Sequence, residues 1–174
     1  ITASFGGSKA TCSVNVMRQT ISMSGGNPIY AKGTGSSTQL TATVNGTVGN
    51  DAVAWTSGNT NIAKVSGGKV TGVGAGTVTI TATSNGVSTS KSIQVKEPTI
   101  KLDRETANIY PPATKTVTFT VTVNGVQGNS GVTWTSGNTK VATVSNGKVT
   151  AVGKGTATIT AKANGKLAKA KVTV

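Results

Sequence analysis

The chain has 174 residues with 23 glycines, 3% aromatic residues and no histidine. The lack of histidine excludes catalytic triads, general bases and metal sites that depend on an imidazole. Seventeen lysines and arginines stand against four acids, for a formal net charge of +13. Such a surface attracts polyanions of any kind, or serves only to keep the chain soluble. Cys12 is the single cysteine, so no disulfide forms within the chain.

The sequence repeats with a period of 79 residues, without insertion or deletion. Residues 54–60 return as residues 133–139, and the tripeptide Ile-Thr-Ala begins at Ile1, Ile80 and Ile159. A fixed period predicts an array of similar domains. Because Ile1 aligns with the tail of each copy, we expect a broken repeat at the start of the chain and a parent protein that is longer at its N-terminus.

The alignment divides the chain into residues 1–16, the C-terminal hairpin of a truncated repeat, and two repeats over residues 17–95 and 96–174. The second repeat has eleven cations and three acids, a net of +8, and the first has five cations and one acid, a net of +4. The linker Lys96-Glu97-Pro98 is short, and Pro98 stiffens it.

Polar and apolar residues alternate with a period of two along both repeats, as in strands with one buried and one wet face. No segment shows helical periodicity. Tight turns are predicted at the Asn-Gly pairs, which are Asn45-Gly46, Asn85-Gly86, Asn124-Gly125, Asn146-Gly147 and Asn164-Gly165. In the second repeat we expect strands at 100–103, 117–123, 132–135, 141–144, 148–152, 156–163 and 167–174, and in the first repeat 79 residues earlier.

About seven short antiparallel strands per repeat predict an all-β fold of tandem immunoglobulin-like β-sandwiches. Trp55 and Trp134 fall on the third strand and are expected to dominate the two cores. Cys12 has the parity of a small buried residue. Lys91 also has the parity of a buried residue, so either its side chain reaches out to solvent or a bulge shifts the register.

Two segments, residues 53–82 and 132–161, carry a resemblance to a known family. Trp-Thr-Ser-Gly-Asn-Thr is followed in the second of them by Val-Ala-Thr-Val-Ser-Asn-Gly-Lys-Val-Thr-Ala-Val-Gly-Lys-Gly-Thr. This order and spacing resemble the bacterial immunoglobulin-like domain, group two. The resemblance implies a sandwich of the kind found in intimin- and invasin-like adhesins, cell-wall-attached proteins and phage structural proteins. It implies a spacer, a decoration or a weak binder of surfaces, and no catalytic residues.

Lysines of the last predicted hairpin form the candidate binding site for polyanions. They are Lys162, Lys166, Lys169 and Lys171, and their counterparts in the first repeat are Thr83, Val87, Ser90 and Ser92. The fold therefore does not require them, although lysines on an exposed strand also prevent edge-to-edge pairing. A specific nucleic-acid partner is not expected, because only two of the cations are arginine and aromatic residues are few.

The acids do not predict a catalytic or metal site. Asp51 stands alone before a strand, Glu97 lies in the linker, and Asp103 and Glu105 flank Arg104. Hard metals need several carboxylate or carbonyl oxygens, so no metal or other cofactor is predicted. No apolar run is long enough to cross a membrane, so membrane insertion is not predicted either.

The sequence thus predicts a non-enzymatic structural spacer, stalk or surface-display module of a longer protein, with a contribution to adhesion left open. The expected location is extracellular, on a bacterial cell surface, with a phage virion surface as the alternative. Its expected partners are the neighbouring repeats of the same chain. Two other functions stay open: docking on anionic cell-surface glycopolymers or glycans through the second-repeat lysines, and an accessory domain of a secreted glycan-active enzyme.

Overall fold

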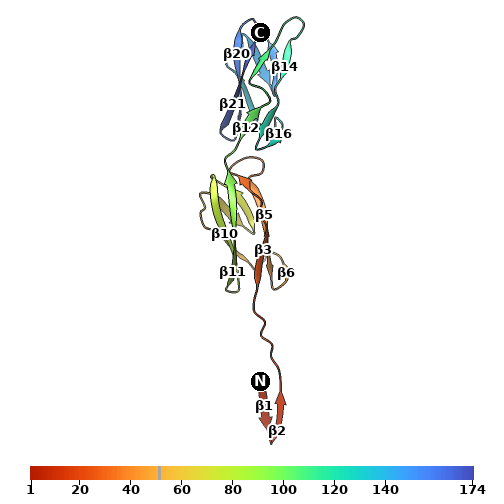
Figure 1. Ribbon diagram of the computed structural model, residues 1–174, viewed down its shortest axis with the longest axis vertical. Helices are drawn as coiled ribbons and strands as arrows, with labels where there is room; N and C mark the ends of the chain where they lie inside the picture. The colour runs from red at the N-terminus through yellow and green to blue at the C-terminus, as the bar shows by residue number, and fades with distance from the viewer. Residues whose placement is uncertain (51) are drawn as a thin grey trace.

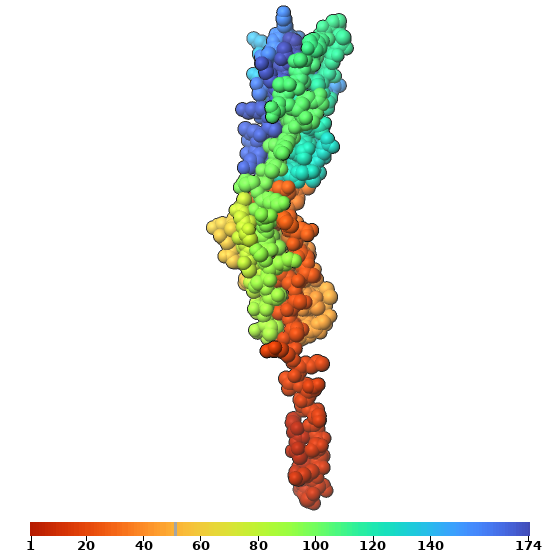
Figure 2. Space-filling model, in the orientation of Figure 1, coloured from red at the N-terminus to blue at the C-terminus, as the bar shows by residue number. Residues whose placement is uncertain are grey.

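The computed structural model describes residues 1–50 and 52–174, so Asp51, the acid expected to stand alone before a strand, lies outside the described residues. The chain runs along one long axis as an N-terminal hairpin, a first repeat and a second repeat (Figure 1). The space-filling view shows a rod that is thinnest near its N-terminus (Figure 2). Every regular element in the described residues is a strand, and none of them forms a helix that could cross a membrane.

The hairpin consists of β1 (Thr2–Phe5) and β2 (Ser8–Thr11), paired antiparallel. No second sheet covers it within the described residues, so all of its side chains are exposed. Cys12, which follows β2, was expected to be buried, and this expectation is wrong because the thiol is exposed.

The first repeat is a sandwich of two sheets. Its strands are β3 (Ile21–Gly25), β4 (Ile29–Tyr30), β5 (Ser37–Val44), β6 (Thr47–Val48), β7 (Ala54–Ser57), β8 (Ala63–Ser66), β9 (Lys69–Gly72), β10 (Gly76–Ser84) and β11 (Val87–Lys96). One sheet has the order β4-β11-β10-β7, and the other has the order β3-β5-β9-β8 with β6 added to β5.

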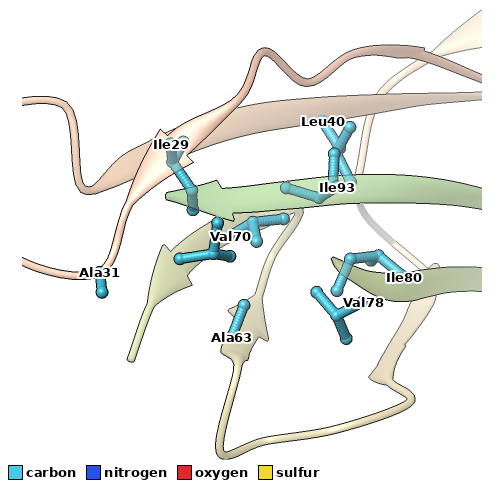
Figure 3. Close-up of a cluster of buried hydrophobic side chains, with 9 residues drawn as sticks. Ile29, Ala31, Leu40, Ala63, Val70, Val78, Ile80 and Ile93 are labelled. Carbon is cyan, nitrogen blue, oxygen red and sulfur yellow. The ribbon is translucent and has the colours of Figure 1, made fainter. Parts of the chain in front are cut away.

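Alternation along these strands places the apolar residues between the two sheets. Ile80 and Ile93 from one sheet and Leu40 and Val70 from the other are each at most 1% exposed and belong to one cluster (Figure 3). The residues that alternate with the buried ones along each strand point to the outer face and are mainly threonine and serine. Threonine in particular favours strands.

The second repeat follows the same plan. Its strands are β12 (Ile100–Leu102), β13 (Thr106–Asn108), β14 (Thr116–Thr118), β15 (Val121–Val123), β16 (Val126–Gln127), β17 (Thr133–Ser136), β18 (Ala142–Ser145), β19 (Lys148–Ala151), β20 (Thr156–Ala163) and β21 (Lys166–Thr173). They form the sheets β13-β21-β20-β17, β12-β15-β16 and β14-β19-β18. The strand expected over residues 117–123 is therefore split into β14 and β15.

A single side chain accounts for this split. The Asp103 carboxylate accepts a hydrogen bond from the Thr120 backbone N–H at 3.0 Å, while the Asp103 N–H donates to the Thr120 carbonyl. In the first repeat the counterparts Ser24 and Thr41 are paired within the continuous ladder of β3 and β5. An aspartate that bonds to backbone groups competes with a sheet ladder, so β12 ends at the residue before it.

Each repeat also contains a parallel pair that the sequence did not predict. β4 runs parallel to the last strand β11, and β13 runs parallel to the last strand β21. β4 and β13 span only two and three residues, which is too short for an alternating pattern to be recognised. The expectation of purely antiparallel strands is corrected to this extent.

The parallel pairs also change the repeat alignment locally. Ile29 pairs with Val95, and Ile109 donates its N–H to the Thr173 carbonyl. The two isoleucines are buried at equivalent places, with 2% and 1% exposure, although they are 80 residues apart. The period of 79 without insertion or deletion is therefore wrong at this point, and the loop that follows in the second repeat is one residue shorter.

Trp55 and Trp134 pack against the edges of their cores and are only half-buried. Their indole Nε1 atoms are buried and have no hydrogen-bond partner among the described residues. The largest fully buried side chain is Phe119, whose counterpart is Leu40. The two tryptophans thus contribute to the cores without dominating them.

Lys91 stays in register opposite Ile80, so no bulge is present at this position. Its ammonium group donates a hydrogen bond to the Gly25 carbonyl oxygen. The first of the two alternatives is confirmed, because the side chain extends out of the sandwich and its charged end is exposed.

We predict that Phe119→Ala lowers the free energy of unfolding of the second repeat by about 3–5 kcal/mol, because it leaves a cavity in a closed core. Trp134→Ala should cost less, since its side chain is only partly buried. Val126→Ala, at a side chain 54% exposed, is the control and should change little. Denaturant unfolding followed by circular dichroism measures the free energy of unfolding of all three variants. In a Trp55→Phe background, Trp134 fluorescence also reports on the second repeat in the two variants that keep Trp134. A larger loss for Trp134→Ala than for Phe119→Ala would make the indole the main core residue.

Candidate functional site at the junction between the repeats

The lysine-rich hairpin presents three of its four lysines on one face. Lys169 and Lys171 lie opposite Thr160 and Thr158 of β20, and Lys162 lies further along the same side of β20. Residues directly paired across strands share a face, and neighbouring positions on it are about 7 Å apart. These three lysines, here called the lysine face, are exposed on the outside of the sheet.

Lys166 does not belong to the lysine face. It lies opposite Ala163, which is buried, and its Nζ is 2.8 Å from Oε2 of Glu97 in the linker. The register turns Lys166 toward the first repeat, so the four lysines of the candidate site do not all share one face. Both side chains of this pair are largely exposed, so it contributes little stability, about 0–1 kcal/mol.

The strongest contact between the repeats comes from Asn124, in the turn between β15 and β16. This residue is only 6% exposed. Its amide Nδ2 donates hydrogen bonds to the carbonyl oxygens of Lys32 at 2.8 Å and Thr34 at 3.0 Å, both in the first repeat. Its Oδ1 accepts the Thr99 N–H at 2.9 Å. Because carbonyls accept and an N–H donates, these partners also fix which amide atom is nitrogen.

The backbone of Asn124 makes this arrangement possible. Its φ is 51°, a left-handed conformation that asparagine adopts more readily than most residues. Its own N–H donates to the Thr99 carbonyl at 3.0 Å, which closes a second bond to the same residue. The side chain is thus held from inside the second repeat before it reaches the first.

The loop that Asn124 holds contains Gly33, with φ of 80°. A Cβ atom at this position would lie 2.1 Å from Nδ2 of Asn164, in the turn between β20 and β21. The positive φ favours glycine at this position, and a larger residue would also require the Asn164 side chain to move. We call residues 32–34 the docking loop, and the turns at Asn124-Gly125 and Asn164-Gly165 the receiving turns.

Sequence reasoning interpreted these asparagines only as turn residues. The bonds from Asn124 to the docking loop join positions 92 and 90 residues apart, which no local pattern reveals. One signal was present: the Asn-Gly pairs at 124 and 164 recur 79 residues after those at 45 and 85. The predicted partnership between neighbouring repeats has these residues as its contacts.

The other polar cluster lies beside β12. Arg104 donates from Nε to Asp103 at 3.0 Å, and its guanidinium lies 5.8 Å from the centre of the Phe119 ring. Burial alone raises the pKa of Asp103, but hydrogen bonds from Arg104 and the Thr120 N–H, with the charge of Arg104, outweigh it and lower the pKa below 3.8. Among the described residues, no three acids or cysteines gather where they could hold a metal.

A family model described as bacterial Ig-like domain (group 2) matches residues 19–95 and 99–174. The chain belongs to this family. The two matched segments coincide with the two sandwiches, and the bacterial Ig-like fold accounts for the all-β architecture. The match does not include residues 1–16.

Several solved structures resemble this bacterial Ig-like chain. The S-layer protein SbsC is 24% identical over 89% of this chain and 27% of its own, with a TM-score of 0.49. A mutant of intimin from EHEC O157:H7 is 28% identical over 51% of each chain, with a TM-score of 0.34. A tandem from titin is 16% identical over 99% of this chain and 72% of its own, with a TM-score of 0.52, and shares the fold.

This chain therefore spans about a quarter of the S-layer protein structure that it resembles, 27% of its length. No curated protein matches the chain.

We predict that the second repeat loses stability in acid through Asp103. A carboxyl with a lowered pKa stabilises the fold above its unfolded value of about 3.9, and this contribution disappears as pH falls through the folded value. Asp103→Ser, which installs the first-repeat residue, should flatten the loss of unfolding free energy between about pH 5 and 2. Glu105→Ser is the control, since Glu105 makes no ion pair within the described residues. Equal slopes for both variants and the natural chain would contradict the role of Asp103.

Proposed function

We propose that the chain is a stiff segment of a surface stalk, in which bacterial Ig-like repeats are joined end to end to hold another part of the parent protein away from the cell. The observation that carries this proposal is the buried Asn124 amide, which belongs to one repeat and bonds to two carbonyls of the other. A stalk needs a defined angle between its repeats, and this contact supplies one.

Three contacts act together at the junction. Asn124 bonds to the docking loop, Asn164 packs against Gly33, and Lys166 pairs with Glu97 of the linker. Pro98 in the same linker is buried and restricts the chain between the repeats. Because these contacts join the second repeat to both the docking loop and the linker, they tie the two repeats together at more than one point.

The shape supports the same role. The two repeats follow one another along the long axis rather than folding side by side (Figure 2). Membership of the bacterial Ig-like family favours a surface module over an enzyme. The location on a bacterial surface is part of the proposal.

We predict that Asn124→Asp makes the junction flexible. Aspartate tolerates the left-handed turn and still accepts the Thr99 N–H, but it has no donor for the docking loop. Two lost hydrogen bonds should raise the open population about tenfold or more. Residual dipolar couplings should fit one alignment tensor for both repeats of the natural chain and two for the variant.

Asn146→Asp is the matched control, because Asn146 occupies an Asn-Gly turn with φ of 48° away from the junction. It should leave one tensor. Lys166→Val, the first-repeat residue at that position, should loosen the junction only slightly, since the ion pair is exposed. If the two repeats of the natural chain already require two alignment tensors, the junction is not stiff. That result would contradict the stalk proposal.

A second function is favoured by the lysine face. Its three cations have no acidic partner among the described residues, and their first-repeat counterparts are uncharged. Such a face attracts anionic glycopolymers of a cell wall through charge rather than shape. It would allow the stalk to lie against or bind a wall while the junction sets its direction.

We predict that the triple variant Lys162→Thr, Lys169→Ser and Lys171→Ser binds teichoic acid beads much less than the natural chain. Binding by the natural chain should fall with salt, since the Debye length shrinks from about 10 Å at 0.1 M to about 3 Å at 1 M. The control is a second triple variant, which removes three lysines outside the lysine face and installs the first-repeat residues at those positions. Its substitutions are Lys115→Ser, Lys140→Asn and Lys154→Ala. Equal loss in both triple variants would show a response to net charge only.

A further inference from the structure

The first repeat carries a second copy of the receiving turn, at its end facing residues 1–16. Asn45 accepts the Thr20 N–H on its Oδ1 at 2.9 Å and donates its own N–H to the Thr20 carbonyl at 3.0 Å. Asn124 makes the same two bonds with Thr99, 79 residues later, at the same distances. The φ values, 48° and 51°, also agree. The amide of Asn45 is therefore held in the orientation that Asn124 uses at the junction.

The two sites differ in what their amide nitrogen contacts. Nδ2 of Asn124 is bonded to two carbonyls, whereas Nδ2 of Asn45 makes no hydrogen bond within the described part of the chain. Asn45 is exposed and lies in a groove beside Met17, Arg18 and Gln19. Its two amide protons are thus presented to solvent by a side chain whose oxygen is already fixed.

The second receiving turn is repeated as well. Asn85-Gly86 precedes Asn164-Gly165 by 79 residues, and the two asparagines have φ values of 49° and 53°. In Figure 1 the turn that follows β5 and leads into β6 lies at the end of the first repeat toward the N-terminus, as the turn that leads into β16 does in the second repeat. The backbone of both turns therefore already has the conformation that the receiving turns have at the junction.

We infer that Asn45 and the Asn85 turn are a docking site for the end loop of a further Ig-like repeat that precedes the first in the same polypeptide. The inference rests on the proposed stalk and extends it by one junction. The chemistry of the ligand is set by the junction that is formed: two backbone carbonyl oxygens on either side of a glycine without room for a Cβ.

Residues 1–16 support this choice of occupant. They repeat the sequence pattern of residues 80–95, which form the last hairpin of the first repeat. From Val16 to Thr20 there are four steps along the chain, as there are from Val95 to Thr99. A repeat that ended in this hairpin would deliver its loop to Asn45 over the same length of linker.

A second copy of this chain fits the site less well. The docking loop of a first repeat is already engaged by its own second repeat. The second repeat has Pro111-Pro112-Ala113-Thr114 in the place of that loop, without a glycine. Two parts of the formed junction are not repeated. Arg18 and Val87 stand where Glu97 and Lys166 make the ion pair, and Gln19 stands where Pro98 restricts the linker. Docking at Asn45 therefore depends on the hydrogen bonds alone.

The test completes the broken repeat. Residues 1–16 of the full chain are replaced by a copy of residues 17–95, which ends in the same hairpin and supplies a Lys-Gly-Thr loop upstream of Met17. In this three-repeat chain the side-chain amide protons of Asn45 should exchange with solvent about tenfold or more slowly than in the natural chain. Asn45→Asp, which keeps the acceptor for Thr20 and loses the donors, should give the added repeat its own alignment tensor.

Asn146→Asp in the same three-repeat chain is the control and should leave a single tensor. Fast exchange of the Asn45 amide in the three-repeat chain, or an Asn45→Asp variant that behaves like the control, would overturn the inference while the junction at Asn124 still stood. Slow Asn45 exchange in the natural chain that depends on protein concentration would instead assign the site to a second copy. If Asn45→Asp unfolds the first repeat, the exchange rates decide by themselves.

Discussion

The arrangement of the two repeats depends on a requirement that only asparagine meets. The turn at residue 124 needs a left-handed backbone, which favours glycine, asparagine and aspartate. The junction needs a side chain that donates twice outward and accepts once inward. Glycine has no side chain and aspartate has no donor. The same residue therefore shapes the turn inside one domain and recognises the backbone of the next.

A second polar side chain shows how a small change redirects a strand. Asp103 and Ser24 occupy equivalent positions, yet only the aspartate accepts the N–H of Thr120 and interrupts the ladder. The core beneath is preserved, because Phe119 and its counterpart Leu40 are both fully buried. Local hydrogen bonding thus varies between repeats while the apolar packing that defines the sandwich does not.

Much of this fold could be predicted because period-two alternation directly reports which face of a strand is buried. β20 occupies the span expected from it, residues 156–163. The parallel strands β4 and β13 were not predicted, because two or three residues are too few to show an alternating pattern. The two tryptophans pack against their cores as partly buried side chains, whereas Phe119 is fully buried, a difference that residue size alone does not predict.

The candidate site was less predictable because its contacts cross between domains. The lysine face followed from the alternation along β20 and β21, but Lys166 lies beside the turn, where its neighbour in space is Glu97 of the linker. Asn124 and Gly33 are both common turn residues. Nothing in the local sequence indicates that Asn124 bonds to a loop about 90 residues away. Period and alternation describe a single repeat, whereas the contacts between repeats depend on how the two domains lie in space.

The parallel pairs bear on how such a chain responds when its ends are pulled apart. β4 enters its repeat near the start and β11 leaves at the end, so tension draws the two strands in opposite directions along their shared length. Their hydrogen bonds lie across the pull and are loaded together in shear rather than one at a time. Forced unfolding is governed by the rate of passing that barrier. The first repeat pairs two residues of β4 with β11 and the second pairs three of β13 with β21, so the pair loaded in shear is shorter in the first repeat.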